Sequence, residues 1–174
     1  MPEFLDPNQV LNQISLQSNF IAADFGCGSG GWTIPLAQRL EEGKVYAIDI
    51  KEEALSALKG RINLAKVNNI KPILADAEKE IPELRNFSCD LVLMTNILFQ
   101  AENRTTIFEQ ASRILKRGGK ILVVEWNFNS PFGPPQDHKV LPEEIKKLAI
   151  ETGLELEKEF EAGSYNFGLL FNKR

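Results

Sequence analysis

The segment Ile21–Trp32 constrains the fold more than any other, because an apolar strand there runs directly into a glycine-rich turn. Gly26, Gly28 and Gly30 recur at every second position, and glycine readily adopts the positive φ angles that a tight turn around a ligand requires. A helix predicted to start near Gly31 would turn its free N–H groups toward the same point. The segment therefore predicts a strand–turn–helix unit with a ligand at the turn.

Two carboxylates indicate what this ligand carries. Asp24 lies two residues before the first glycine, where it would face a cationic group across the turn. Asp49 ends the next predicted strand, at about the 20-residue spacing of a carboxylate that binds ribose hydroxyls. An amino acid joined to a nucleoside has both the cationic group and the ribose hydroxyls that these carboxylates would bind. Gly26, Gly28 and Gly31 also satisfy the dinucleotide-binding pattern G-x-G-x-x-G, so the glycines alone do not exclude a dinucleotide as the ligand.

The composition is that of an ordinary globular protein and predicts one domain over residues 1–174, with 1–19 as a short N-terminal helix region. Of the 174 residues, 43% are hydrophobic and 25% charged, and the net charge of −4 gives no signal for nucleic acid. Cys27 and Cys89 have neither metal-ligand nor disulfide spacing, which favours a reducing compartment and no metal. Because no leader or apolar span is evident, we expect a cytoplasmic protein without membrane contact.

Apolar stretches of strand length alternate with helical patterns and then end in a close pair. The predicted strands are Phe20–Phe25, Lys44–Ile50, Ile70–Ala75, Asp90–Thr95, Lys120–Trp126, Leu154–Phe160 and Asn166–Phe171. Helices between strands indicate parallel crossovers, whereas the short link 161–165 can join only antiparallel neighbours. We therefore expect a single α/β domain: a Rossmann-like, mostly parallel seven-stranded sheet with helices on both faces and a C-terminal antiparallel hairpin.

Periodic apolar positions predict the helices. They are Pro7–Ile14, Trp32–Leu40, Lys51–Val67, Asn103–Leu115 and Pro142–Thr152, with a weaker single turn at Glu78–Leu84. The segment Asn127–Gln136 contains three prolines and a glycine, so we expect an irregular loop there.

Five short motifs lie in order along the chain, each at or beside a predicted strand. They are Asp24–Gly30 (DFGCGSG), Val45–Asp49 (VYAID), Asp76–Ala77, Phe87–Asn96 (FSCDLVLMTN) and Arg113–Val123 (RILKRGGKILV). With the predicted order of elements, they resemble the class I S-adenosylmethionine-dependent methyltransferases, in particular the methyltransferase type 11 domain family. The resemblance implies S-adenosylmethionine as cofactor, S-adenosylhomocysteine as product and methyl transfer to an acceptor.

The resemblance also assigns cofactor-binding roles. The turn backbone would pass beside the methionine part, with Asp24 offsetting its ammonium, while Asp49 would bind the ribose. Ile50 would pack on an adenine face. The full implied set is Asp24, Gly26, Cys27, Gly28, Gly30, Asp49, Ile50, Asp76, Ala77, Thr95 and Asn96.

Within that set, three assignments have competing interpretations. Asp76 would accept from the adenine amino group and the Ala77 N–H would donate to a ring nitrogen, but Asp-Ala after a strand is also a simple helix N-cap. A backbone carbonyl at Thr95 or Asn96 would meet the ammonium. We interpret Cys27 as a small apolar residue that fills space in the core, in preference to a nucleophile.

The acceptor half is less defined. A sulfonium methyl is already activated, so positioning supplies most of the catalysis, and a general base is needed only if the acceptor must lose a proton. Glu125 and His138 are the weak candidates, with a core role for Glu125 and a surface role for His138 left open. We expect a small-molecule acceptor more than a macromolecule. The segment 127–138 is predicted to be a mobile lid, with the alternative that Phe128 and Phe132 only anchor the loop to the core. Completion of the site by a second subunit of a homodimer also stays open.

Two other classes remain. A non-catalytic S-adenosylmethionine-binding module would keep the same pocket, and only the acceptor half would distinguish it. An NAD(P)-binding oxidoreductase would use the same glycines and Asp49, but would leave Asp76–Ala77 unexplained and lack a Tyr-x-x-x-Lys proton donor.

Overall fold

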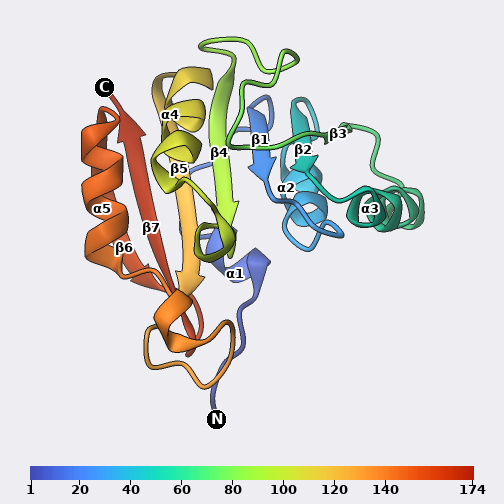
Figure 1. Cartoon of the computed structure of the whole chain (residues 1–174). Helices are drawn as coiled ribbons and strands as arrows, with labels where there is room; N and C mark the ends of the chain where they lie inside the picture. The colour runs from blue at the N-terminus through green and yellow to red at the C-terminus, as the bar shows by residue number, and fades with distance from the viewer.

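The computed structural model describes residues 1–174 and contains one seven-stranded sheet with helices on both faces (Figure 1). The strands are β1 (Ile21–Phe25), β2 (Lys44–Asp49), β3 (Ile70–Leu74), β4 (Cys89–Thr95), β5 (Leu115–Trp126), β6 (Leu154–Glu161) and β7 (Asn166–Lys173). Their spatial order is β3-β2-β1-β4-β5-β7-β6. The strands β1 to β5 pair in parallel, and β7 runs antiparallel to both β5 and β6. The predicted fold class is confirmed.

The closing hairpin places β7, not β6, beside β5, and side-chain character explains the order. Six consecutive residues of β7 from Asn166 to Phe171 are buried, as a strand between two neighbours requires. The sequence of β6, LELEKEFE, is mostly charged and exposed. Charged side chains at a sheet edge discourage pairing with other chains, so β6 is suited to the outer position.

The helices are α1 (Pro7–Leu11), α2 (Thr33–Arg39), α3 (Glu52–Ala65), α4 (Arg104–Ile114) and α5 (Pro142–Glu151), with short 3₁₀ turns η1 (Leu98–Gln100) and η2 (Gln136–His138). Two predictions at helix level were wrong. Residues 78–84 form turns without a helix, because Pro82 lacks an N–H and disfavours helical backbone at the residue before it. The first helix ends at Leu11 rather than Ile14.

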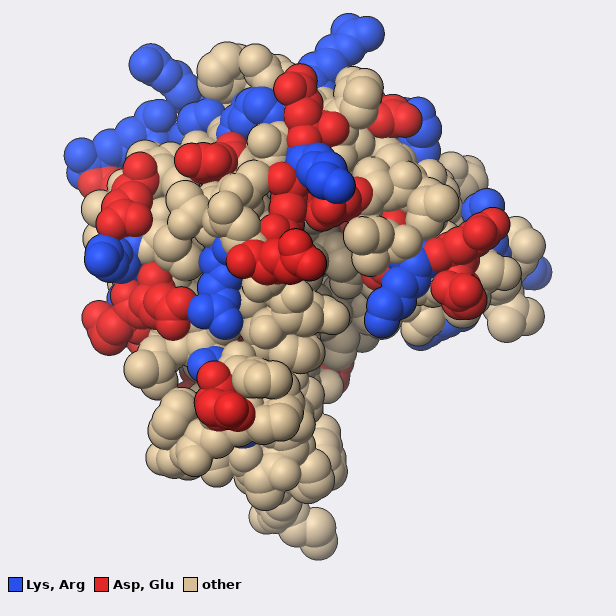
Figure 2. Space-filling model, in the orientation of Figure 1, with Lys and Arg blue, Asp and Glu red and all other residues tan.

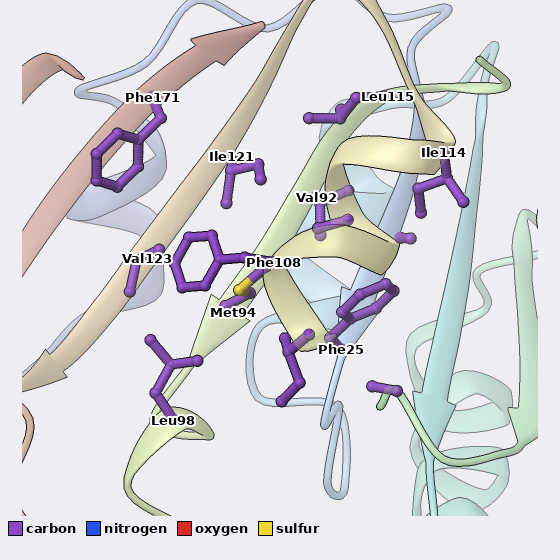
Figure 3. Close-up of a cluster of buried hydrophobic side chains, with 14 of the residues drawn as sticks. Phe25, Val92, Met94, Leu98, Phe108, Ile114, Leu115, Ile121, Val123 and Phe171 are labelled. Atoms are coloured by element: carbon purple, nitrogen blue, oxygen red, sulfur yellow. The ribbon is translucent and has the colours of Figure 1, made fainter. Parts of the chain in front are cut away.

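Two apolar layers hold the sheet between the helices. Twenty-five buried residues form the cluster on the face covered by α4 and α5, where Phe108 of α4 meets Phe171 of β7 edge to face, with ring centroids 6.5 Å apart (Figure 3). Fifteen buried residues form the cluster on the other face, under α1 and α2. This packing places the carboxyl ends of β1, β2, β4 and β5 along one edge of the sheet, the edge formed by strand ends at the bottom of Figure 1. The glycine turn and the segment after β5 both start from that edge.

Candidate active site

The glycine turn after β1 has the backbone that the sequence predicted. Gly26, Gly28 and Gly30 have φ angles of +71°, +55° and +92°. A Cβ at Gly26 would lie 2.6 Å from Ile97 Cδ1, and one at Gly30 would lie 2.4 Å from Leu58 Cδ1, so a side chain at either position would displace the end of its neighbour. A Cβ at Gly28 would meet nothing within 4 Å. The surface above Gly28 is therefore the open side of the turn, where a ligand can approach the backbone.

Asp24 is fully buried at the base of this turn. Its Oδ2 accepts a hydrogen bond from Thr33 Oγ1 at 2.7 Å, while its Oδ1 is buried without any partner. Burial raises the pKa of the Asp24 carboxyl to about 7, and the nearby Asp49 charge adds to this, against the lowering effect of the Thr33 hydroxyl. An unpartnered carboxylate oxygen is costly in a protein interior, so Asp24 is suited to pairing with a cationic or hydrogen-bond-donating ligand group.

Asp49 and Ile50 lie at the end of β2, facing the turn. The Asp49 carboxylate is half-buried and accepts from the Gly28 N–H and the Lys51 N–H, both at 2.9 Å. A carboxylate has about four acceptor positions, so two remain for a ligand such as a ribose diol. Ile50 follows with 66% of its surface exposed, an apolar side chain with little packing of its own. Both residues fit the cofactor roles that the family resemblance implies.

In the segment after β3, Asp76 caps a turn and not the helix N-terminus that the sequence had offered, because no helix follows it. Its Oδ1 accepts from the Glu78 N–H at 2.9 Å, which is the local turn-capping geometry. Glu78 in turn accepts from the Glu102 and Asn103 N–H groups at 2.8 and 2.7 Å, which ties this segment to the start of α4. Ala77 is buried in the large core cluster. The segment is thus anchored at the site edge, and the adenine contact stays a prediction.

The end of β4 brings Thr95 and Asn96 to the same edge. Asn96 has φ +52°, a left-handed backbone that asparagine tolerates better than most residues. Its N–H donates to the Val124 carbonyl at 2.8 Å, and its Oδ1 accepts from Asn166 Nδ2 at 3.3 Å. The next residue, Ile97, forms the contact beneath Gly26 described above. The turn after β4 therefore supports the glycine turn from below.

Cys27 and the two candidate bases have different surroundings. Cys27 is buried in a small apolar cluster, and burial raises the pKa of its thiol far above the usual range, so the filler interpretation fits the geometry. Glu125 is buried, accepts from the Leu98 N–H at 2.7 Å and has a pKa raised to about 7 by burial. His138 is exposed in η2, with its Nε2 4.0 Å from Asp137. The structure brings Glu125, but not His138, into the buried framework of the site.

The segment after β5 borders a second opening. A cavity of about 510 Å³ lies between this segment and the β6–β7 turn; its lining residues are Asn127, Phe128, Asn129, Ser130, Pro131, Pro142, Ser164, Tyr165 and Phe167. The buried Lys139 holds the segment by donating to the Ser130 carbonyl at 2.6 Å. Phe132 packs edge to face on Tyr165, with centroids 4.8 Å apart, and Phe4 joins from the N-terminal segment at 6.0 Å from Phe132.

We call Phe4, Phe128, Phe132 and Leu141 the apolar tip. These side chains are 68%, 42%, 45% and 47% exposed. Figure 2 shows that the lower end of the molecule, where the N-terminal segment and the segment after β5 lie, carries few acidic or basic side chains compared with the rest of this face. Charged side chains, which are frequent on the rest of this face, are thus sparse around the second opening.

Several supporting residues were not predicted from the sequence. Thr33 contacts Asp24 and Lys139 contacts the Ser130 carbonyl from nine positions away, whereas Asn166 contacts Asn96 from 70 positions away. None of the three lies in one of the five motifs. The one available hint was the presence of polar residues within apolar stretches.

Comparisons with known proteins agree with this geometry. The "Methyltransferase domain" family matches residues 22–119, more than half of the chain. A demethylmenaquinone methyltransferase of Oceanobacillus iheyensis is 28% identical over 116 residues, covering 66% of this chain and 48% of that protein. The enzyme of the same name from Geobacillus stearothermophilus is 30% identical over 125 residues, covering 71% and 53%. The chain thus spans about half the length of these curated relatives.

Solved structures of several proteins share the fold of this chain. A SAM-dependent methyltransferase from Aquifex aeolicus is 25% identical, with a TM-score of 0.88 over 96% of this chain and 89% of that one. A type 11 methyltransferase from Sulfolobus solfataricus, at 24% identity and a TM-score of 0.78 over 100% and 94%, shares the fold. The [4+2]-cyclase SpnF also shares it, at 13% identity and a TM-score of 0.84 over 96% and 79%.

The chain belongs to the methyltransferase domain family, whose members use S-adenosylmethionine. This confirms the recognised family and the cofactor class; the individual site residues stay predictions supported by their geometry. No helix combines the length and the apolar character needed to cross a membrane.

Proposed function

We propose that this chain transfers a methyl group from S-adenosylmethionine to a small, largely apolar acceptor bound beside the segment 127–138. The observation that carries the proposal is the buried, unpartnered Asp24 Oδ1 directly below a turn whose glycines all have positive φ. The ammonium of the cofactor's methionine part would supply the missing partner. Asp49 would hold the ribose and Ile50 would cover one face of the adenine.

The roles of the protein are binding and alignment. The cofactor, when bound, supplies a methyl group already activated on a sulfonium. Holding an acceptor in line with that methyl provides the main rate enhancement open to a site without a nucleophile. Phe128 and Phe132 would exclude water from the acceptor. If the acceptor must release a proton, His138 on the loop remains a candidate base, whereas Glu125 already accepts from backbone N–H groups.

The character of the acceptor is inferred from the second opening. Its lining mixes aromatic and proline side chains with asparagine and serine, which suits a flat apolar molecule with a few polar substituents. The relatives named demethylmenaquinone methyltransferases act, by their names, on such a molecule. Demethylmenaquinone is therefore the first acceptor to test. Because the same fold also occurs in a cyclase, methyl transfer has to be measured and not inferred from the fold.

Two measurements test the proposal. Calorimetric titration of the purified chain with S-adenosylhomocysteine and with NAD should show binding of the first and not the second. Incubation with methyl-labelled S-adenosylmethionine and either demethylmenaquinone or an extract of small metabolites should transfer label to a small molecule. Binding without transfer to any acceptor would instead favour the non-catalytic binding module. Binding of NAD alone would favour the oxidoreductase.

A further inference from the structure

Both backbone groups of Leu98, the first residue of η1, are held by charged side chains. Its N–H donates to Glu125 Oε1 at 2.7 Å, and its carbonyl accepts from Arg104 Nε at 2.9 Å. Arg104 is itself paired with Glu144 of α5 at 2.6 Å. Glu125 comes from β5 and Arg104 from α4, so two separate elements contact the backbone of one residue, and Glu144 of α5 pairs with Arg104.

Leu98 directly follows the residues that support the glycine turn. Ile97 lies against Gly26 so closely that a Cβ there would be 2.6 Å from its Cδ1, and Asn96 stands at the end of β4 with φ +52°. A left-handed asparagine followed by an irregular turn keeps its conformation only where the surroundings determine it. The contacts on Leu98 provide that constraint.

Glu125 itself is placed for anchoring and not for contact with an acceptor. Only 1% of its surface is exposed, and the backbone N–H groups of Leu98, Trp126 and Ile97 surround its carboxyl group. Arg104 is the charged side chain facing it from the helices packed on this face, with Glu144 behind Arg104. An acid surrounded by N–H donors stabilises a particular turn conformation, since an ionised acceptor forms the stronger hydrogen bonds.

We infer that Glu125 is a positioning residue for the cofactor site, which holds the Leu98 peptide and thereby seats Asn96 and Ile97 beneath the glycine turn. The inference rests on the proposed function, because the glycine turn that Asn96 and Ile97 support is the one that binds S-adenosylmethionine. It replaces the role of general base considered from the sequence. The chemistry of Glu125 would then act through backbone geometry and not on the acceptor.

The test compares Glu125→Gln with Glu109→Gln, a matched change at an exposed glutamate of α4 that has no side-chain partner. Glutamine keeps the shape of Glu125 but places an NH₂ group among the surrounding N–H donors. Hydrogen exchange, measured without any ligand, should become faster in residues 96–98 of Glu125→Gln only. Its affinity for S-adenosylhomocysteine should fall roughly tenfold at a temperature where it is fully folded, as for loss of one bond to a charged acceptor.

Each other outcome decides against the inference. Unchanged exchange in 96–98 would show that Glu125 does not anchor the turn. Faster exchange with unchanged affinity, or a lowered Tm alone, would show an anchor with a purely structural role. If Glu125→Gln does not fold, Arg104→Gln removes the other contact to Leu98 at a more exposed position and should move both measurements in the same direction. A parent chain that fails to bind S-adenosylhomocysteine would overturn the proposed function first, and the role of Glu125 with it.

Discussion

The glycine turn and the segment after β5 stand at the same edge of the sheet but are built by different means. The turn is defined by backbone conformation and charge: three glycines with positive φ, Asp24 beneath them and Asp49 facing them. The segment 127–138 is held by larger side chains at its ends and from the N-terminal segment. Lys139 holds its carbonyls, the Trp126 ring lies where a Cβ on Gly133 would be, and Phe4 contacts Phe132.

This difference bears on the proposed function. A turn that binds a cofactor through its backbone needs a fixed conformation, and glycine and aspartate at fixed spacing provide one. An acceptor site lined by aromatic and proline side chains makes fewer demands on the exact position of each residue. The cofactor half should therefore respond sharply to single substitutions, and the acceptor half only gradually.

The largest effect is expected from Gly28→Val. Valine at φ +55° is strained by about 1–2 kcal/mol, and its side chain would fill the open space above the turn, so binding of S-adenosylhomocysteine should be lost. Gly118→Val is the matched control, since Gly118 has φ +75° and equally open surroundings but lies near the start of β5, at the end of the strand away from the site. It should lose a similar amount of stability and keep full affinity. Calorimetry on both variants checks this; equal binding by the two would place the ligand elsewhere.

The next effect concerns Asp49→Ala. Removing the proposed acceptor of two ribose hydroxyls, at about 1.5–3 kcal/mol per bond, should weaken binding by tenfold or much more. The fold should persist, because the carboxylate is half-buried and its protein partners are two N–H groups in turns. Titration with S-adenosylhomocysteine and a thermal unfolding curve give the two quantities. Unchanged affinity would remove Asp49 from the cofactor site.

A smaller, graded effect should appear on changing pH. The free Asp24 carboxyl has a pKa raised to about 7 by burial, and an ammonium ligand pairs with its ionised form. Below pH 7, binding must therefore displace a proton, and affinity for S-adenosylhomocysteine should fall by up to roughly tenfold per pH unit. Above pH 7 this dependence should flatten.

Asp24→Asn supplies the control for that pH dependence. It should bind more weakly at pH 8 and lose the slope below pH 7. Glu125 also has a pKa raised to about 7. If the slope persists in Asp24→Asn and disappears in Glu125→Gln, the titrating group is Glu125 and the prediction for Asp24 is wrong. Calorimetry at several pH values between about 5.5 and 8 distinguishes the two groups.

The sequence predicted most of the fold, for reasons visible in particular elements. Strand–helix alternation predicted the parallel part of the sheet, and the short 161–165 link predicted the antiparallel end. The start of β5 at Leu115, before the predicted Lys120, was not predicted, because the pairing of β4 with β5 shifts in register between Cys89 and Leu91 and so extends past the glycines. The alternation of apolar and polar residues does not reveal such a shift.

At the site, local features were predictable and remote contacts were not. The positive φ of Gly26, Gly28 and Gly30 follows from residue type, since no other residue adopts that backbone so easily. The contact of Glu125 with Leu98 joins residues that lie 27 positions apart and depends on the pairing of β4 with β5. The buried character of Glu125 could be suspected from its apolar strand, but its partner could not.

The smallest effect is expected at the acceptor half, from replacing Phe128 and Phe132 together by serine. Both rings are somewhat less than half exposed, so an acceptor that covers them would lose about 1 kcal/mol of apolar contact, roughly a fivefold rise in its KM. Affinity for S-adenosylhomocysteine should stay unchanged, because neither ring touches the glycine turn. Transfer assays at varied acceptor concentration, together with calorimetry, separate the two effects.

The competing role for these rings is to attach the segment to its surroundings. The edge-to-face pair of Phe132 with Tyr165 contributes about 0.5–1.5 kcal/mol, and its loss alone would lower the Tm by a few degrees in a chain of this size. Phe87→Ser, at a ring that is 61% exposed just before β4, at the opposite edge of the sheet, controls for removing an exposed phenylalanine. A lower Tm with unchanged turnover per folded molecule would make the segment 127–138 part of the scaffold. A raised acceptor KM in the double variant alone would make it the cover of the acceptor site.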